Sequence, residues 1–142
     1  MEYYVIYYSQ TGNTKEMAEA VGEGIGEAGG TAKIVPVEEA RVDMIKDAMV
    51  FALGCPAAGA ENLEDAWMEP LVSELEGFAS GKKIALFGSY GWGGGEWMRD
   101  WEERMQKAGA QIIDGEGVIC QEAPDEETLG KCRELGKKMA QM

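Results

Sequence analysis

A run of polar residues at positions 9–14 is the first place in this sequence where chemistry could occur. Five polar side chains surround one glycine there, as Ser9, Gln10, Thr11, Gly12, Asn13 and Thr14, and a helical pattern follows directly. Free backbone N–H groups and the helix dipole at a helix N-terminus both favour an anion. The run holds no Lys or Arg, so amides and hydroxyls would bind a phosphate group. Helix capping alone would explain one such residue rather than five.

A second candidate is the glycine-rich run at positions 88–95, which places Trp92 between two glycines. An aromatic side chain at such a loop tip offers a stacking surface for a planar ligand. The other three tryptophans, Trp67, Trp97 and Trp101, lie at helical spacing and are predicted to belong to the core. The sequence therefore predicts a site that combines phosphate binding with ring stacking.

Several other chemistries lack the residues that they need. The chain has no histidine, which excludes His-based catalytic triads, and its three cysteines show no C-x-x-C spacing for zinc or a disulfide framework. The P-loop pattern G-x-x-x-x-G-K-[ST] is absent, and no acidic pair follows the first apolar run as a receiver domain would require. Glu61 and Glu64 could be paired carboxylates, but a solvated loop is the expected account of both.

The elements that must position these loops follow from an alternation of short apolar runs and helical stretches. Strands are predicted at 3–8, 32–37, 48–53, 83–87 and 111–119, the last broken by D-G-E-G at 114–117. Helices are predicted around 17–28, 67–75, 97–108 and 129–139, with Pro124 in the first turn of the last one. Only a short connection is expected at 38–46. Right-handed crossovers then give an α/β, doubly wound parallel sheet whose ligands bind beyond the carboxyl ends of its strands.

The first predicted helix contains three glycines, Gly22, Gly24 and Gly26. Each glycine inside a helix costs about 1 kcal/mol relative to alanine. Tertiary packing must therefore hold this helix in place.

Length and charge limit what the chain can do. A chain of 142 residues with 45% hydrophobic residues predicts a single domain over 1–142. The net charge of −13 repels nucleic acid and anionic membranes, and it either attracts a basic protein or simply keeps a monomer in solution. No apolar run reaches the roughly 20 residues of a membrane span, and the start resembles no secretory signal, so a cytoplasmic location is expected.

Four motifs together point to a known family. They are T-G-N-T within 9–14, G-C-P-A-x-G-x-E at 54–61, G-S-Y-G-W-G at 88–93 and P-D-E at 124–126. On these motifs the chain resembles the short-chain flavodoxins from end to end. The resemblance implies a flavodoxin-like three-layer sandwich with a five-stranded parallel sheet in the order 2-1-3-4-5. It also implies FMN at the point where the strand order reverses.

The resemblance implies a role for individual residues as well. Residues 9–14 would bind the FMN phosphate, Trp92 would stack on the outer face of the flavin, and Glu61 would bond its N3 edge. The carbonyl of Gly59 would turn toward flavin N5 in the semiquinone. The remaining expected contacts come from Pro56, Ala57, Ala58, Ala60, Ser89, Tyr90, Gly91 and Gly93, with Gln121 and Glu122 approaching from the last loop.

Two positions depart from the family pattern. Ala58 stands where relatives often carry methionine, so it would cover less of the inner flavin face. Ala60 resists the positive φ that a type II turn would need there, which favours a type II′ turn with positive φ at Gly59. We expect Ala60 to bias the carbonyl orientation in this turn and so to change the stability of the semiquinone.

These expectations describe a low-potential carrier that moves one electron at a time on non-covalently bound FMN, with no catalytic residue and no metal. Its expected partners are basic redox proteins, either iron–sulfur or flavin oxidoreductases. One alternative is a small FMN-dependent reductase with its own small-molecule acceptor. Another is an interaction module that uses the same scaffold without a cofactor.

Overall fold

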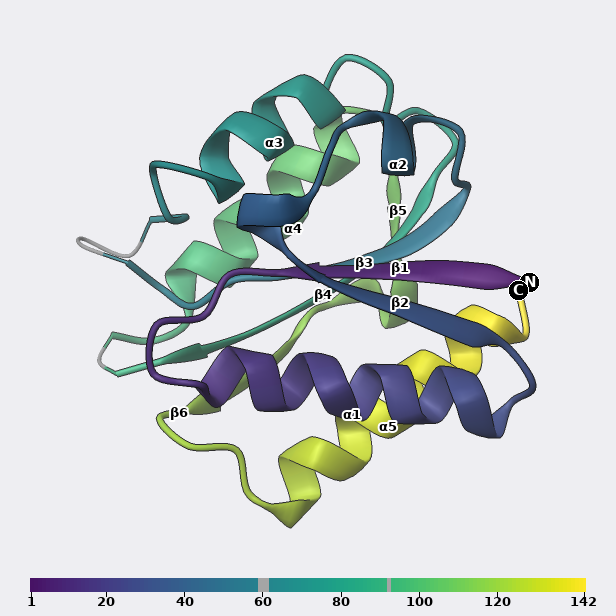
Figure 1. Cartoon of the computed structure of the whole chain (residues 1–142). Helices are drawn as coiled ribbons and strands as arrows, with labels where there is room; N and C mark the ends of the chain where they lie inside the picture. Colours follow the sequence, from purple (N-terminus) through teal and green to yellow (C-terminus); the bar gives the residue numbers. More distant parts are fainter. Residues whose placement is uncertain (59–61, 92) are drawn as a thin grey trace.

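The protein is built around a parallel β-sheet, seen in a computed structural model that describes residues 1–58, 62–91 and 93–142. The strands run in the order β2-β1-β3-β4-β5, as predicted (Figure 1). Their bounds are Glu2–Tyr7 for β1, Thr31–Pro36 for β2, Val50–Gly54 for β3, Lys83–Tyr90 for β4 and Gln111–Ile112 for β5.

The edge of the sheet beyond β4 consists of two short strands rather than one. β5 pairs with Lys83 and Ile84 near the start of β4, whereas β6 (Val118–Gln121) pairs with its last four residues. The short 3-10 helix η2 (Ile113–Gly115) separates them, and Asp114 in it has a φ of 66°. The predicted break at 114–117 is confirmed, and the second half of the strand runs on to Gln121.

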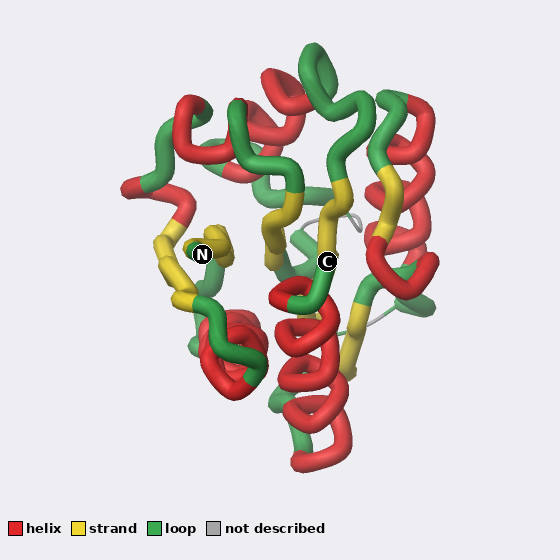
Figure 2. Tube along the Cα trace, turned by 90° about the vertical axis from the view of Figure 1, so that its right-hand side faces the viewer, coloured by secondary structure: helices red, strands yellow, loops and turns green. Residues whose placement is uncertain are grey.

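Helices cover both faces of the sheet. α1 (Asn13–Glu27) and α5 (Glu126–Ala140) lie on one face, and α3 (Met68–Leu75) and α4 (Glu96–Lys107) lie on the other with the one-turn α2 (Asp43–Lys46). Figure 2 shows the strands between these two helix layers. The connection expected at 38–46 begins within the 3-10 helix η1 (Val37–Glu39) and contains α2.

The strand residues point alternately into two hydrophobic cores. Ile6, Leu53 and Leu86 belong to the core under α3 and α4, whereas Val5 and Ala52 belong to the core under α1 and α5. A strand buried on both faces needs a continuous apolar run, which is the pattern that the sequence shows.

One glycine of α1, Gly24, finds its explanation in the contact with α5. A Cβ atom on Gly24 would lie 1.9 Å from the carbonyl oxygen of Arg133, and one on Gly136 would lie 2.0 Å from that of Val21. The two helix backbones therefore touch directly. The packing that Gly24 and Gly136 permit compensates for their low helix propensity.

Two local predictions are wrong. Trp67 was expected in the core, but it is 48% exposed and precedes α3. Pro124 lies before the N-cap of α5 rather than in its first turn, because the carboxylate of Asp125 accepts the N–H of Thr128 at 2.8 Å and begins the helix there. Trp97 and Trp101 are buried as predicted. Among the helices of the described residues, none combines the length and the apolar character needed to span a membrane.

Candidate functional site

A cavity of about 380 Å³ lies at the carboxyl ends of β1, β3 and β4, where the order of the strands reverses. This is the place at which doubly wound sheets bind their ligands, and the volume falls within the range of small-molecule sites. Its walls come from four segments of the chain: Tyr8, Ser9, Gln10, Thr11, Asn13, Thr14, Pro56, Ala57, Ala58, Glu64, Ser89, Tyr90, Gly91 and Glu122.

The loop at 9–14 forms a compact turn at the start of α1. The hydroxyl oxygen of Ser9 accepts the N–H groups of Gly12 at 3.1 Å and Lys15 at 3.2 Å. Gly12 is the N-cap residue and has a φ of 95°, which a residue with a side chain rarely adopts. Gly12 therefore shapes the loop without lining the cavity.

The same loop contains backbone donors that have no acceptor within the described residues. The described residues provide no hydrogen-bond acceptor for the backbone N–H groups of Gln10, Thr11, Asn13 and Thr14. The first N–H groups of a helix have no partner inside the helix, and together with the helix dipole they attract an anion. No Lys or Arg lines the described part of the cavity, so these amides would bind a phosphate without a counter-charge.

Thr14 connects this loop to the end of β4. Its hydroxyl lies 3.1 Å from that of Ser89, and both residues are buried. The N–H of Ala57 donates to the carbonyl of Ser89 at 3.0 Å, so the segment after β3 continues alongside β4. Residues that the sequence placed in three separate loops thus meet at one wall of the cavity.

Part of the predicted site lies outside the described residues. This applies to Gly59, Ala60, Glu61 and Trp92, so their expected contacts remain predictions. On either side of 59–61, Ala58 and Asn62 exchange two backbone hydrogen bonds of 2.9 and 2.8 Å. Gly93 is described but does not line the cavity.

An aromatic pair joins the cavity wall to the buried residue Trp97. The ring of Tyr90, which lines the cavity, lies 5.5 Å from that of Trp97 at an angle of 52°. The indole N–H of Trp97 donates to the carbonyl of Cys55 at 3.1 Å. Burial raises the pKa of the Cys55 thiol to about 12, so this cysteine stays protonated at neutral pH.

The sequence analysis missed two residues of the cavity wall. Tyr8 directly follows β1, and its position immediately before the polar loop was the available signal. Glu64 was assigned to a solvated loop, which is wrong: it is 9% exposed, and its carboxylate accepts the N–H groups of Ala66, Trp67 and Met68 at 2.7 to 2.9 Å. An acidic residue just before an apolar helical pattern would have indicated this capping role.

The last loop approaches the cavity as expected. Glu122 lines it in a left-handed backbone conformation with a φ of 59°, and its N–H donates to the carbonyl of Tyr90 at 2.7 Å. The side-chain amide of Gln121 donates to the carbonyl of Gly91 at 3.4 Å. Glu64 and Glu122 are thus two acidic residues of a cavity whose described lining residues include no Lys or Arg.

Comparison with known proteins gives consistent matches. A protein-family model described as Flavodoxin matches residues 5–136. A flavodoxin of Clostridium beijerinckii is 44% identical over 136 residues, which cover 96% of this chain and 97% of that protein. A flavodoxin of Megasphaera elsdenii is 42% identical over 96% of both chains. The solution structure of the two-electron reduced M. elsdenii flavodoxin superimposes with a TM-score of 0.87 at 40% identity and covers both chains completely.

Proposed function

The chain belongs to the flavodoxin family, and from this premise we propose that the cavity at residues 9–14 holds its FMN and serves one-electron transfer at low potential. The protein is an FMN-binding electron carrier rather than an enzyme. When bound, FMN supplies the redox chemistry, and the chain's own residues bind it, orient it and set its electrostatic surroundings.

The observation that carries the placement of FMN is the loop at 9–14. Its unpaired N–H groups and its lack of cationic side chains fit a phosphate bound by backbone amides. The buried hydroxyl pair of Thr14 and Ser89 would fix the loop against β4 beneath that phosphate. Tyr90 and the segment at 56–58 would then bound the flavin ring on the other side of the cavity.

The charge around the cavity supports a low potential. Electrons added to a bound cofactor increase its negative charge, and two acidic residues, Glu64 and Glu122, line the same cavity. Like charges in a partly dry site repel each other, which disfavours the reduced state. The net charge of −13 acts in the same direction.

The same charge bears on the partners and the setting of the protein. We propose that basic iron–sulfur or flavin oxidoreductases dock to it, because opposite charges accelerate their encounter. We further propose that residues 1–142 form a single domain that works as a monomer in the cytoplasm. The three cysteines, all free thiols, fit a reducing compartment.

The decisive experiment is an anaerobic reductive titration of the purified protein with added FMN, followed by visible spectroscopy. We expect one FMN per chain and two well-separated one-electron steps. A protein that binds no FMN would contradict the proposal. A single two-electron step would instead favour the reductase alternative, and turnover with NAD(P)H in the absence of a second protein would establish it.

A further inference from the structure

The segment at 59–61, which is expected to contact the flavin, lies between two stems of the chain. Ala58 in the first stem and Asn62 in the second exchange two backbone hydrogen bonds of 2.9 and 2.8 Å. Both stems also reach the cavity, because residues 56–58 and Glu64 line it. The positions of the two stems therefore limit where residues 59–61 can contact a bound ring.

Contacts with β4 and α4 hold the first stem. The N–H of Ala57 donates to the carbonyl of Ser89 in β4 at 3.0 Å. The indole N–H of Trp97 in α4 donates to the carbonyl of Cys55 at 3.1 Å, and both of these residues are buried. The first stem is thus fixed by the main chain of β4 and by the core.

The second stem is held by the carboxylate of Glu64, a buried side chain. One carboxylate oxygen accepts the N–H groups of Trp67 at 2.8 Å and Met68 at 2.9 Å, and the other accepts that of Ala66 at 2.7 Å. The N–H groups at the start of a helix have no acceptor inside the helix, and the helix dipole favours a negative charge there. The cap therefore fixes the direction in which the chain leaves the cavity and enters α3.

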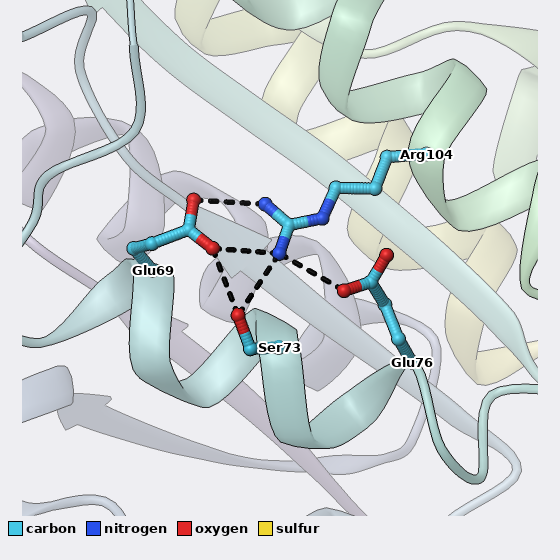
Figure 3. A network of polar contacts seen from close by, with 4 residues as sticks. All are labelled: Glu69, Ser73, Glu76 and Arg104. Carbon is cyan, nitrogen blue, oxygen red and sulfur yellow. Dashed lines mark hydrogen bonds and ion pairs between the residues drawn. The ribbon is translucent and has the colours of Figure 1, made fainter.

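The helix that Glu64 caps is itself attached to α4 (Figure 3). The guanidinium of Arg104 donates to Glu69 in the first turn of α3 at 2.8 and 2.6 Å, to Ser73 at 3.1 Å and to Glu76 at 3.0 Å. The N–H of Glu69 donates to the carbonyl of Glu64 at 2.9 Å. Glu64 thus joins the second stem to a helix whose position is already determined by α4.

We propose that Glu64 is a positioning residue for the bound FMN. Its cap holds the second stem and so keeps residues 59–61 in place for the contact with the flavin that is expected on one-electron reduction. This inference rests on the proposed function and adds to it a residue to which the family resemblance assigns no role. Glu64 acts through the backbone of 62–68, because its carboxylate is bonded to the start of α3.

The position and the charge of Glu64 change the first reduction potential in opposite directions. A segment whose two ends are fixed loses less conformational entropy when it contacts a ligand. Without the cap, the contact at 59–61 costs more, so the one-electron-reduced state becomes less stable and the first midpoint potential falls. Loss of the negative charge alone favours an added electron and raises that potential.

Two substitutions that remove the same charge separate these effects in the FMN-loaded protein. Glu64→Ala removes both acceptor oxygens, whereas Glu64→Gln keeps one oxygen that can still accept the N–H groups of Trp67 and Met68. We expect the equilibrium constant of the first one-electron step to be about tenfold lower in Glu64→Ala than in Glu64→Gln. In a redox titration this is a difference of about 59 mV.

Asp125 provides the matched control. Its carboxylate caps α5 by accepting the N–H of Thr128, and it does not line the cavity. Asp125→Ala and Asp125→Asn should therefore have equal first potentials, although Asp125→Ala unfolds at a lower urea concentration because it has lost the cap. A merely structural role of Glu64 would give the same result for the Glu64 pair.

Amide hydrogen exchange in the unmodified apoprotein gives a second test that needs no substitution. We expect the N–H groups of Trp67 and Met68 to be protected, because Glu64 binds them before FMN arrives. Exchange as fast as in an unfolded chain would overturn the inference. Equal first potentials in Glu64→Ala and Glu64→Gln, with FMN bound to both, would also overturn it and leave the proposed function intact. If the unmodified protein bound no FMN, the proposed function would fall, and the inference with it.

Discussion

The hydroxyl oxygens of Thr14 and Ser89 lie 3.1 Å apart, although 75 positions separate the two residues along the chain. Thr14 is the last residue of the polar loop and the second residue of α1, and Ser89 lies near the end of β4. The contact is buried, so each hydroxyl depends on the other for a hydrogen bond within the described structure. It thereby connects the loop proposed to bind phosphate to the strand that borders the flavin.

Thr14→Val tests this connection. The substitution keeps the shape of the side chain but leaves the hydroxyl of Ser89 without its partner, and an unpaired buried polar group costs about 1–3 kcal/mol. We expect FMN to bind about tenfold more weakly, as measured by titration of the apoprotein. Thr31→Val, at an exposed position in β2, should leave the affinity unchanged. Equal affinities for both variants would show that the hydroxyl pair has no role in FMN binding.

Glu122→Gln tests the electrostatic effect of the cavity wall. Removing a negative charge beside the bound cofactor favours its more reduced, more negative state. The midpoint potential of the second one-electron step should therefore rise by about 20–50 mV at low salt, as measured by redox titration. Glu19→Gln makes the same charge change at a residue of α1 that does not line the cavity, and it should shift the potential less. Equal shifts for both would mean that only the net charge matters.

Gly24→Ala tests the helix contact between α1 and α5. Since the new methyl group would collide with the carbonyl of Arg133, we expect the free energy of unfolding to fall by about 3 kcal/mol in urea denaturation. Gly26→Ala is the matched control in the same helix, because no atom lies within 4 Å of its added Cβ. Its stability should stay the same or rise by up to about 1 kcal/mol. Similar losses in both variants would disprove the steric explanation.

The buried thiols predict how stability depends on pH. Burial raises the pKa of Cys132 to about 12, whereas an unfolded thiol ionises near pH 8.5. Above that pH the unfolded chain loses a proton that the native chain keeps, so stability falls as the pH rises toward 12. In Cys132→Ala, the slope of unfolding free energy against pH should be shallower by up to about 1.4 kcal/mol per pH unit between pH 9 and 11. Parallel lines for the two proteins would contradict this account.

The sheet was predictable from the sequence because burial on both faces leaves a strong pattern. Continuous apolar runs located β1, β3 and β4, and the D-G-E-G run at 114–117 located the break between β5 and β6. The strand order followed from the resemblance to flavodoxins. The polar loop at 9–14 was recognisable because several donors and acceptors collect at the start of a helix.

The features that could not be predicted depend on contacts between segments that lie far apart along the chain. Trp67 has the spacing of a core residue, but α3 begins only after it because the Glu64 carboxylate caps the N–H groups at that point. The spacing of apolar residues does not show that a side chain before the helix, here that of Glu64, turns inward and caps it. The packing role of Gly24 could not be predicted from the sequence either, because its contact Arg133 lies more than a hundred positions away.

The contact between α1 and α5 also determines where the polar loop can be. Gly24 lies eleven residues beyond Asn13, or roughly 16 Å along a helix that rises 1.5 Å per residue. The close approach of Gly24 to the carbonyl of Arg133, and of Gly136 to that of Val21, restrains α1 from sliding along α5. The position of the loop at 9–14 along the helix axis is thus set by a contact near the C-terminal end of α1, and this contact forms during folding. A phosphate would meet donors whose axial position is already fixed, and its arrival would require no movement of α1.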